Sequence, residues 1–393
     1  MVEKPRLLVL LSRVPYPLDK GDKLRAYHQI KGISQSFRII LVCLSAEKID
    51  SKAIVELEKY CEKIEIIRLN KMGILWRLFT GFFFDLPFQV LYFKSKNAQK
   101  KIDLLIEKYT PKRFYCQLIR VTEYTIKYSI FNKTLDYMDA LSIGMKRRLE
   151  NAPFYLKPLI AAEYNRLITY ENKMFKHFEQ KIIISGQDKE YIAHQNTDEI
   201  EVVANGIDFE YWKPEKTAKK YDVVFTGNMS YPPNVEGALY IVKEVLPILK
   251  KAKPSIQILI CGKNPSSSVR RLANENVTVT GWVEDIRTAY NNSKVFFAPM
   301  ALGSGLQNKL LEAMCMQLPC VTSELANKAL SASPNKEILI GKSPEEYAKH
   351  ILALLDNQEQ SDTLALNGKK YVEANFDWMV LNQRLVSIIS GKD

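Results

Sequence analysis

Residues 300–322 read MALGSGLQNKLLEAMCMQLPCVT, and this stretch decides the fold prediction. A turn of Gly303, Ser304 and Gly305 leads directly into a short helical pattern, which stops at a proline before an apolar strand. Glycine lets the backbone approach a ligand closely, and the first free amides of a helix attract negative charge. The stretch therefore predicts an anion-binding loop at the start of a helix.

The helical pattern after the turn has two different faces. At about 100° per residue, Asn308, Lys309 and Glu312 share one face. The opposite face is apolar and consists of Leu306, Leu310, Ala313 and Met314. Lys309 and Glu312 also have the spacing of a solvated surface pair, which is the commoner use of such residues. The glycine turn in front of them favours a binding site instead.

Length and composition describe an ordinary globular protein with room for two domains. The chain has 393 residues, of which 47% are hydrophobic and 25% charged, so each of two domains can bury its own core. The net charge of +12 is uneven: residues 1–199 carry 34 Lys and Arg against 23 Asp and Glu, and residues 200–393 carry 22 against 21. Unless it is only lysine enrichment, a basic half suggests an anionic membrane surface or a phosphorylated substrate. Nucleic acid is not expected, because no compact Lys/Arg run with interleaved aromatics occurs.

Cysteine and histidine usage argues against a disulfide framework and against a zinc site. The chain has four His and no CxxC pair, and its six Cys are scattered: Cys43, Cys61, Cys116, Cys261, Cys315 and Cys320. We expect reduced, mostly buried thiols in a cytosolic protein. The apolar run at residues 7–11 is soon followed by Pro15 and is too short for a signal sequence, so it predicts a first buried strand.

The alternation of apolar runs and helical patterns predicts two parallel sheets with helices on both faces. In the N-terminal half, strands are expected at residues 6–11, 37–44, 64–69, 112–119, 134–137 and 181–185. A loop with Gly21 connects the first strand to a helix, as in a βαβ unit. A domain boundary is expected near residues 202–209, and the strands beyond it at 221–227, 256–261, 277–280, 294–298 and 320–322. A final helix is expected at residues 375–389.

Residues 72–93, MGILWRLFTGFFFDLPFQVLYF, depart from this alternation. The segment is rich in aromatic residues and poor in charge, but Gly81 and Pro87 interrupt any helix before it can span a bilayer. Two interpretations stay open. The segment is either an ordinary buried helical excursion with its connecting loop, or a patch that lies at a membrane interface.

An acidic pair, Asp136 and Asp139, lies at the end of the strand expected at residues 134–137. Ligands of open α/β sheets bind beyond the carboxyl ends of the strands, so a carboxylate at this place suits catalysis. Asp139 is equally suited to cap the following helix, which is the commoner use of an isolated Asp. The glycine loops have neither the spacing GxxxxGK(S/T) nor the spacing GxGxxG, so we set aside P-loop ATPases and dinucleotide oxidoreductases.

The chain contains, in this order, VPYPLDKGDKLRAYHQI, VVANGID, VVFTGNMSYPPNVEGALYIVKEVLP, GWVEDIRTAYNNSKVFFAPM, GSGLQNKLLEAMCMQLPCVTS and YVEANFDWMVLNQRL. Together these motifs resemble the GT4-type retaining glycosyltransferases of the GT-B fold, in particular bacterial sugar transferases of polysaccharide and exopolysaccharide assembly. The resemblance covers nearly the whole chain. It implies an α/β protein with two Rossmann-like domains that face each other across a cleft. Residues 1–200 would bind the acceptor, residues 201–375 the nucleotide-sugar, and residues 376–393 would form a helix that returns to the first domain.

The resemblance also implies an activity and a donor site. The expected enzyme transfers a hexosyl group from a nucleoside diphosphate sugar, with retention and with no metal or other cofactor. Lys309 would neutralise the diphosphate as it leaves, and Glu312 would bind the ribose hydroxyls. The other positions implied for donor binding are Gly21, Gly227, Asn228, Val283 beside Trp282, Gly303, Ser304, Gly305, Leu306 and Asn308.

The sequence departs from the family pattern at two places. Ser304 stands where the first glutamate of the paired-glutamate motif is expected, eight residues before Glu312. Asn228 and Asn234 stand where many members carry the Arg and Lys that clamp the diphosphate. These departures leave more of the charge compensation to Lys309.

On the acceptor side, family members place a His or Asp that orients the acceptor; Asp139 is the candidate here and Asp136 the reserve. The implied acceptor is a glycan or polyprenol-linked sugar, and the protein is expected in the cytoplasm at the anionic inner face of the membrane. Two other functions stay open. One is a sugar-nucleotide 2-epimerase, which shares the architecture, and the other is a protein that binds a sugar nucleotide without turnover.

Overall fold

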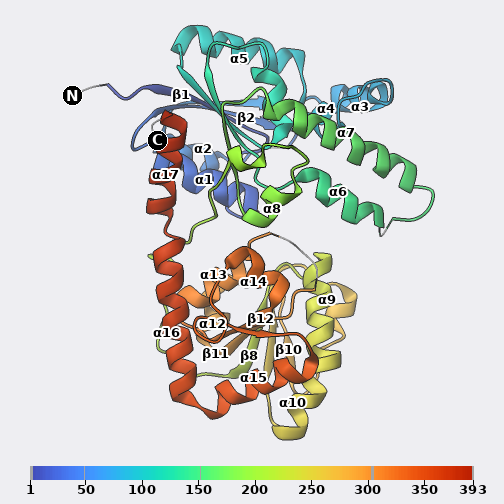
Figure 1. Cartoon of the computed structure of the whole chain (residues 1–393), viewed down its shortest axis with the longest axis vertical. Coiled ribbons are helices and arrows are strands. Elements are labelled where there is room, and N and C mark those ends of the chain that lie inside the picture. Colours follow the sequence, from blue (N-terminus) through green and yellow to red (C-terminus); the bar gives the residue numbers. More distant parts are fainter. Residues whose placement is uncertain (1–2, 48, 151, 302–304, 392–393) are drawn as a thin grey trace. The chain divides into compact units, whose positions relative to one another are not determined.

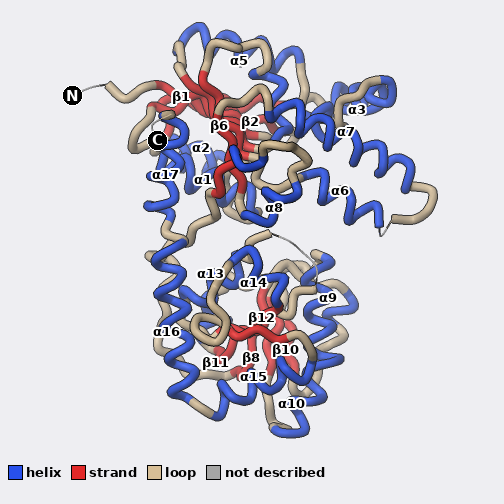
Figure 2. The backbone as a smooth tube through the Cα atoms, viewed as in Figure 1, coloured by secondary structure: helices blue, strands red, loops and turns tan. Residues whose placement is uncertain are grey.

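The computed structural model describes residues 3–47, 49–150, 152–301 and 305–391. The chain forms two compact units. The first comprises Met1–Ala204 and Trp378–Asp393, and the second comprises Asn205–Asp377. The division falls a few residues beyond the expected boundaries at 200 and 375. Each unit contains a parallel sheet with helices packed on it (Figures 1 and 2).

The first unit is built on a seven-stranded parallel sheet with the order β3-β2-β1-β4-β5-β6-β7. Its strands are β1 (Arg6–Leu11), β2 (Arg38–Ser45), β3 (Cys61–Arg68), β4 (Arg113–Gln117), β5 (Asn132–Asp136), β6 (Gln180–Ile183) and β7 (Ile200–Val202). Its α-helices are α1 (Gly21–Ile33), α2 (Ser51–Glu58), α3 (Lys71–Thr80), α4 (Phe88–Phe93), α5 (Lys96–Tyr109), α6 (Leu141–Glu150), α7 (Lys157–Phe175), α8 (Gly186–Tyr191) and α17 (Trp378–Ser390). The strand order reverses between β1 and β4, which is where open α/β sheets bind ligands.

The sheet of the first unit is buried on both faces. Along β1, Leu8 and Leu10 pack into a core that includes side chains of α5 and α7. Leu7, Val9 and Leu11 belong to a second core with side chains of α1, α2 and α17. Neighbouring residues of a strand point to opposite faces, so a sheet covered on both sides requires consecutive apolar residues. This is why an unbroken apolar run predicted the strand correctly.

The C-terminal helix α17 packs on α1 of the first unit, as predicted. Asn382 Nδ2 donates to the backbone oxygen of His28 at 3.0 Å, and the rings of His28 and Trp378 stack with their centroids 4.9 Å apart. A Cβ added at Gly32 would lie 2.3 Å from the Asn382 side chain, so glycine permits this close approach. The helix was expected to begin at residue 375, but Asn375 is the last residue of the preceding helix α16 (Gln358–Asn375), and α17 begins at Trp378.

Residues 72–93 form helical structure that is only partly buried. The helix α4 packs into the core, with Val90 fully buried and Phe93 9% exposed. In contrast, α3 and the 3-10 turn Gly81–Phe83 expose a row of large apolar side chains. Seven of them are 58–80% exposed: Met72, Leu75, Trp76, Phe79, Phe82, Phe83 and Phe84. The interpretation as an ordinary buried excursion is therefore wrong for α3 and residues 81–84, whereas α4 agrees with it.

The second unit contains a six-stranded parallel sheet with the order β10-β9-β8-β11-β12-β13. Its strands are β8 (Tyr221–Thr226), β9 (Ile258–Cys261), β10 (Val277–Val279), β11 (Ser293–Ala298), β12 (Cys320–Ser323) and β13 (Leu339–Gly341). The α-helices of this unit, besides α16, are α9 (Pro232–Tyr240), α10 (Leu246–Ala252), α11 (Ser267–Arg270), α12 (Arg287–Asn291), α13 (Asn308–Cys315), α14 (Glu324–Leu330) and α15 (Pro344–Asp356). The strand order reverses between β8 and β11.

The strands predicted from the sequence are all present, with ends that differ by a few residues. The prediction missed the three-residue strands β7 and β13, because so few residues show no periodicity. All six cysteines are free, and only Cys61 is not fully buried, which confirms that they are mostly buried. Among the described residues, no helix combines the length and the apolar character needed to cross a bilayer.

Candidate functional site

The glycine turn before α13 is described only in part. Gly303 and Ser304 lie outside the described residues. Gly305 and Leu306 are half-buried, and Gln307 Nε2 donates to the backbone oxygen of Gly305 at 3.0 Å. A Cβ added at Gly305 would meet no atom within 4 Å. The described part of the fold therefore leaves open space beside Gly305.

The helix α13 has the two faces that its sequence predicts, with one correction. Its apolar face is fully buried and includes Leu310, Ala313 and Met314. Leu306 precedes the helix, which begins at Asn308, so the assignment of Leu306 to the helical face was wrong. Lys309 and Glu312 lie on the other side and are neither fully buried nor fully exposed. The helix therefore presents one cation and one carboxylate toward the carboxyl edge of the sheet.

Lys309 is held by neutral partners. Its Nζ donates to Asn234 Oδ1 at 2.5 Å, lies 3.7 Å from Met300 Sδ and sits 4.7 Å from the centroid of the Phe225 ring. No carboxylate of the described residues forms an ion pair with it. Burial lowers the pKa of Lys309 to about 7, although the more distant Glu312 raises it. A lysine in such surroundings gains charge stabilisation when an anion binds.

The loop between β8 and α9 fixes Asn234 in the orientation that Lys309 needs. Asn234 Nδ2 donates to the backbone oxygen of Asn228 at 3.0 Å, so its Oδ1 faces the lysine. A Cβ at Gly227, where φ is +156°, would lie 2.6 Å from Asn234 Nδ2. A Cβ at Gly262 would lie 1.7 Å from the Gly227 oxygen. Two glycines thus allow this loop to pack closely against its neighbours.

Glu312 is anchored through one of its two oxygens. Glu312 Oε2 accepts a hydrogen bond of 2.7 Å from Tyr290 Oη, and the same hydroxyl lies 2.8 Å from Thr226 Oγ1. The Tyr290 side chain is fully buried. Burial raises the pKa of Glu312, while the hydrogen bond from Tyr290 and the charge of Lys309 oppose the rise. Within the described chain the second oxygen has no hydrogen bond, which suits it to accept from ligand hydroxyls.

Two further predicted donor positions lie at the same carboxyl edge. Asn308 Oδ1 lies 3.5 Å from Asn205 Nδ2, so the first residue of α13 contacts the VVANGID motif. Val283 is half-buried and Trp282 is 73% exposed, both in the loop that follows β10. We refer to Lys309, Asn234, Phe225, Met300 and Glu312 as the Lys309 group. Within the described chain, neither Val283 nor Trp282 makes a polar contact with this group, since β10 is two strands away from β8.

A pocket of about 490 Å³ adjoins the Lys309 group through Met300. Its walls lie beyond the carboxyl ends of β11, β12 and β13 and on α9 and α15. The lining residues are Glu236, Gly237, Tyr240, Pro299, Met300, Ala301, Ser323, Glu324, Leu325, Gly341, Lys342 and Tyr347. The pocket thus lies at this edge of the sheet and shares Met300 with the contacts of Lys309.

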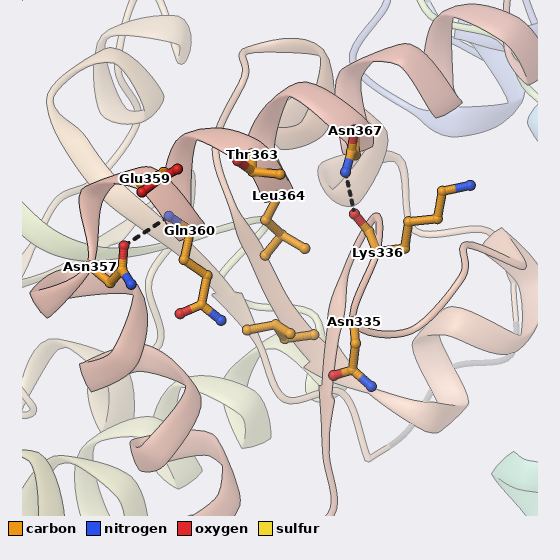
Figure 3. A pocket seen from close by; sticks show the side chains of 9 residues that line it. Asn335, Lys336, Asn357, Glu359, Gln360, Thr363, Leu364 and Asn367 are labelled. Atoms are coloured by element: carbon orange, nitrogen blue, oxygen red, sulfur yellow. Dashed lines mark hydrogen bonds between the residues drawn. The ribbon is translucent and has the colours of Figure 1, made fainter.

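A second pocket, of about 310 Å³, lies at the opposite edge of this sheet, where β13 begins (Figure 3). Side-chain amides dominate its walls, but two of them are already engaged: Asn367 Nδ2 donates to the Lys336 oxygen at 3.1 Å, and Asn357 Oδ1 accepts from the Gln360 amide at 3.0 Å. The first bond ties the loop before β13 to α16, and the second caps the start of α16. The pocket is thus part of the scaffold and lies away from Lys309.

In the first unit, Asp136 is a structural residue. Its Oδ2 accepts from Arg25 Nε at 2.7 Å, and both side chains are 0% exposed. Gln29 Nε2 donates to the same oxygen at 3.0 Å, and Tyr115 Oη lies 2.8 Å from it. Oδ1 accepts from the backbone amide of Met138 at 2.9 Å. A carboxylate with this many buried partners is not accessible to an acceptor substrate, so Asp136 is ruled out as the residue that orients the acceptor.

Asp139 has the opposite environment. Its side chain is exposed, yet the surrounding protein removes part of its hydration and raises its pKa, while Arg25 and Arg120 lower it. The alternative that Asp139 caps α6 fails among the described residues, because Glu171 accepts from the amide and hydroxyl of Ser142 in the first turn. Asp139 therefore stays a candidate for chemistry.

Gly21 is the first residue of α1, at the carboxyl edge of the first sheet. A Cβ added at Gly21 would meet no atom within 4 Å, so neither packing nor an unusual φ requires glycine at this position in the described chain. The role of Gly21 in approaching a phosphate stays a prediction.

The residues of the Lys309 group converge on the switch point of the second sheet. Phe225 belongs to β8, Asn234 to α9, and Lys309 and Glu312 to α13, which follows β11. Ligands of open α/β sheets bind at this place. An ammonium and a carboxylate on one helix face can hold a diphosphate and a sugar diol together. These features define a protein of the doubly wound α/β class, with a candidate site for an anion and hydroxyl groups in its second unit.

Sequence reasoning missed four members of this site: Asn205, Phe225, Tyr290 and Met300. All four occur in motifs that carried the family resemblance: VVANGID for Asn205, VVFTGN for Phe225, and GWVEDIRTAYNNSKVFFAPM for Tyr290 and Met300. Nothing in their spacing shows that they contact α13, because those contacts depend on which strands become neighbours in the sheet.

Residues 220–357 match the family "Glycosyl transferases group 1". The matched part runs from β8 to the end of α15 and contains Asn234, Tyr290, Lys309 and Glu312. The second unit is therefore a group 1 glycosyl transferase domain, and the predicted resemblance is confirmed. The GT4 subclass stays a prediction.

Two relatives span different shares of the chain. "Uncharacterized 44.6 kDa protein in cps region" from Klebsiella pneumoniae is 24% identical over 394 residues, which cover 95% of this chain and 96% of that protein. The "Capsular polysaccharide biosynthesis glycosyltransferase CapM" of Staphylococcus aureus is 24% identical over 202 residues, which cover 47% of this chain and 52% of that protein. A named glycosyltransferase thus shares sequence with about half of this chain. The likeness over nearly the whole chain is to an uncharacterized protein in a cps region.

The architecture of the whole chain agrees with solved structures. Anabaena HepE in complex with UDP superposes with a TM-score of 0.69 at 14% identity, covering 98% of this chain and 100% of that one. A putative UDP-N-acetylglucosamine 2-epimerase from Listeria monocytogenes has a TM-score of 0.59 at 12% identity, covering 99% and 96%. Identities this low show the fold alone. They confirm the predicted GT-B architecture, which transferases and epimerases share.

Proposed function

We propose that this protein transfers a hexosyl group from a nucleoside diphosphate sugar to a glycan or polyprenol-linked acceptor in cell-surface polysaccharide assembly, with retention at the anomeric carbon. One observation carries the proposal: Lys309 is held at the switch point by Asn234 and Phe225 without an anionic partner among the described residues. A diphosphate supplies the missing charge. The relatives from capsular polysaccharide biosynthesis support the acceptor class.

The chemistry follows from where charge develops. The bond between the anomeric carbon and the diphosphate oxygen breaks, and the acceptor hydroxyl oxygen forms the new glycosidic bond and loses its proton. The products are the glycosylated acceptor, the nucleoside diphosphate and one proton. The negative charge that grows on the leaving diphosphate faces Lys309, so stabilisation there acts most strongly in the transition state. Glu312 would position the donor through its ribose hydroxyls, and Asp139 would orient the acceptor.

A calorimetric screen against UDP, GDP, ADP, CMP and dTDP is the first test, with UDP first because HepE was solved with UDP. We expect one nucleoside diphosphate to bind the wild-type protein and to bind the Lys309→Gln variant at least 10-fold more weakly. Failure of all five to bind would count against the proposal as a whole. Transfer is then measured with the matching donor sugars and a lipid-linked acceptor, with and without EDTA, since metal independence is part of the proposal.

The same assays separate the two remaining functions. A sugar-nucleotide 2-epimerase converts its donor when no acceptor is present, so incubation with UDP-sugars alone distinguishes it from a transferase. A non-catalytic binding protein would bind the nucleotide and turn over nothing. We propose the transferase because the likeness in sequence is to glycosyltransferases, whereas the epimerase shares the fold at 12% identity.

The proposed place of action is the cytoplasm, peripherally at the inner face of the membrane. The free cysteines and the surplus of Lys and Arg in residues 1–199 support this, because reduced thiols fit the cytoplasm and basic surfaces are attracted to anionic lipids. Nucleic acid is not proposed as a partner.

A further inference from the structure

The helix α3 presents an apolar stripe to solvent. Met72, Leu75, Trp76 and Phe79 have the spacing i, i+3, i+4, i+7 of one helix face, and they are 63–73% exposed. The same helix also anchors itself on the core, where Ile74 is 5% exposed. Helices of globular proteins turn such a stripe toward their core. Here the core-facing and the solvent-facing sides are both apolar.

Further exposed apolar side chains follow shortly after α3. Phe82, Phe83 and Phe84 follow directly and are 59%, 80% and 58% exposed. Scattered exposed apolar residues are normal on a protein surface, but contiguous ones mark an interaction site. We refer to the exposed residues between 72 and 84 as the α3 patch.

A second exposed apolar group lies at the connection from α6 to α7. Phe154 is 84% exposed and Tyr155 is 67% exposed, and Leu156 and Leu159 follow at 39% and 42%. The next turn of α7 is already buried at Ile160. We refer to residues 154–159 as the α7 tip. It is separated from the α3 patch by about 70 residues of sequence, within the same unit.

The helix α7, which begins within the α7 tip, contacts the chain at the end of the α3 patch. Arg166 Nη1 donates to the backbone oxygen of Gly81 at 3.0 Å, and its guanidinium stands 4.9 Å from the centroid of the Phe88 ring. Glu163 accepts from the backbone amides of Phe88 and Gln89 at 2.7 and 3.1 Å. Leu159 is seven residues before Arg166, which is about 10 Å along a helix, and it lies on the same helix face. In Figure 1, α3 and the connection between α6 and α7 lie on the same side of the first unit.

The charges around both groups are mostly positive. Residues 146–157 carry four Lys and Arg against one Glu, and residues 71–85 carry Lys71 and Arg77 against Asp85. Arg77 donates to the backbone oxygens of Leu91 and Tyr92, so Lys71 is the outward cation of α3. Lys71 stands at the start of the α3 patch and is exposed, as are Lys146 and Lys157 on either side of the α7 tip. Aromatic side chains flanked by lysines suit the boundary between lipid headgroups and acyl chains, because rings enter the boundary and ammonium groups meet anionic headgroups.

We propose that the α3 patch and the α7 tip form one two-part docking surface for an anionic lipid bilayer. This inference deepens the peripheral-membrane clause of the proposed function and assigns it to named residues. Two attachment points fix the orientation of the first unit on the membrane, which a single helix does not. A bilayer is favoured over a protein partner because the exposed cations Lys71, Lys146, Arg148 and Lys157 outnumber the exposed carboxylates Asp85 and Glu150. Lysine is depleted in protein interfaces and is attracted to anionic lipids.

Flotation with large vesicles tests the proposal on the full-length protein without donor or acceptor. The vesicles contain phosphatidylcholine with 30% phosphatidylglycerol, or phosphatidylcholine alone. We expect binding to the anionic vesicles, weakened by 0.5 M NaCl and much reduced on the neutral ones. The paired variants Trp76→Ser with Phe83→Ser, and Phe154→Ser with Tyr155→Ser, should each lower the partition coefficient about 10-fold.

A matched control is available within the same unit. Ile130 and Val55 are 89% and 63% exposed but lie outside both groups, so Ile130→Ser with Val55→Ser should leave flotation unchanged. Every variant is also tested for nucleotide binding, which should not change, so that misfolding and failure of the donor site are told apart from loss of docking. The proposal is overturned if wild type does not float, or if only one of the two groups matters. Light scattering that shows a dimer lost in the Trp76 variant would assign the α3 patch to a second copy instead.

Discussion

Donor binding should depend on pH through Lys309. Burial lowers the pKa of this lysine to about 7, and a bound diphosphate restores a pKa near the ordinary value by supplying an opposite charge. The free protein must then take up a proton in order to bind the donor above pH 7. The affinity for the donor therefore falls as pH rises. A site that must release a proton before it binds its ligand would show the opposite trend.

The size of the effect follows from the fraction of Lys309 that is charged in the free protein. With a pKa of about 7, affinity drops about 10-fold between pH 6 and pH 8 and about 10-fold more by pH 9, and each factor of ten is about 1.4 kcal/mol. At pH 8, binding should take up about 0.9 proton per donor. A sugar nucleotide is the right ligand, because its diphosphate has no ionisation of its own in this range.

Isothermal calorimetry from pH 6 to pH 9 measures the slope, and a comparison of buffers with different ionisation enthalpies measures the proton uptake. Lys309→Arg keeps its charge throughout and should bind with no slope, and Lys309→Gln should bind weakly with no slope. The reasoning is refuted if wild-type affinity is flat across this range, or if Lys309→Gln retains the slope.

Three further predictions concern carboxylates. Asp136→Asn should lower the free energy of unfolding in urea by about 3–5 kcal/mol, because it leaves Arg25 buried without its partner; a loss below 1 kcal/mol would contradict the structural role. Glu312→Gln should weaken donor binding about 10-fold in calorimetry with no loss of melting temperature, since Tyr290 keeps an acceptor; unchanged affinity would remove Glu312 from the donor site. Asp139→Asn should lower kcat about 100-fold and leave donor affinity and melting temperature unchanged, and an unchanged kcat would end its candidacy.

The sequence predicts those parts of this molecule that depend on local pattern. The strand β1 was expected at residues 6–11 and occupies Arg6–Leu11, because an unbroken apolar run fits a sheet covered on both faces. The separation of Lys309 and Glu312 from the apolar face of α13 followed from helical periodicity alone. Both features are decided by residues that are close together in the chain.

Features that depend on distant partners were not predictable. Asp136 has the position of a catalytic carboxylate after a strand, but its partner Arg25 is 111 residues away, and only the fold shows that the pair is buried. Tyr290 and Glu312 meet because β8, β11 and their helices are neighbours. The α3 patch was ambiguous for a related reason, since an apolar helix has the same sequence whether its second side faces a core or solvent.

The asparagine at position 234 has a physical consequence for the donor site. A lysine at this position would place a second ammonium beside Lys309 Nζ, and the two like charges would repel each other until a diphosphate arrived. A carboxylate at position 234 would form an ion pair with Lys309 and so compete with any anionic ligand for its charge. Asn234 does neither, because its oxygen accepts from Lys309 at 2.5 Å while its nitrogen donates to the Asn228 oxygen. The Asn234 amide therefore positions Lys309 without neutralising its charge, so the charge is available to a bound diphosphate. Asparagine in place of the family's positive side chain thus still leaves a site that suits a diphosphate.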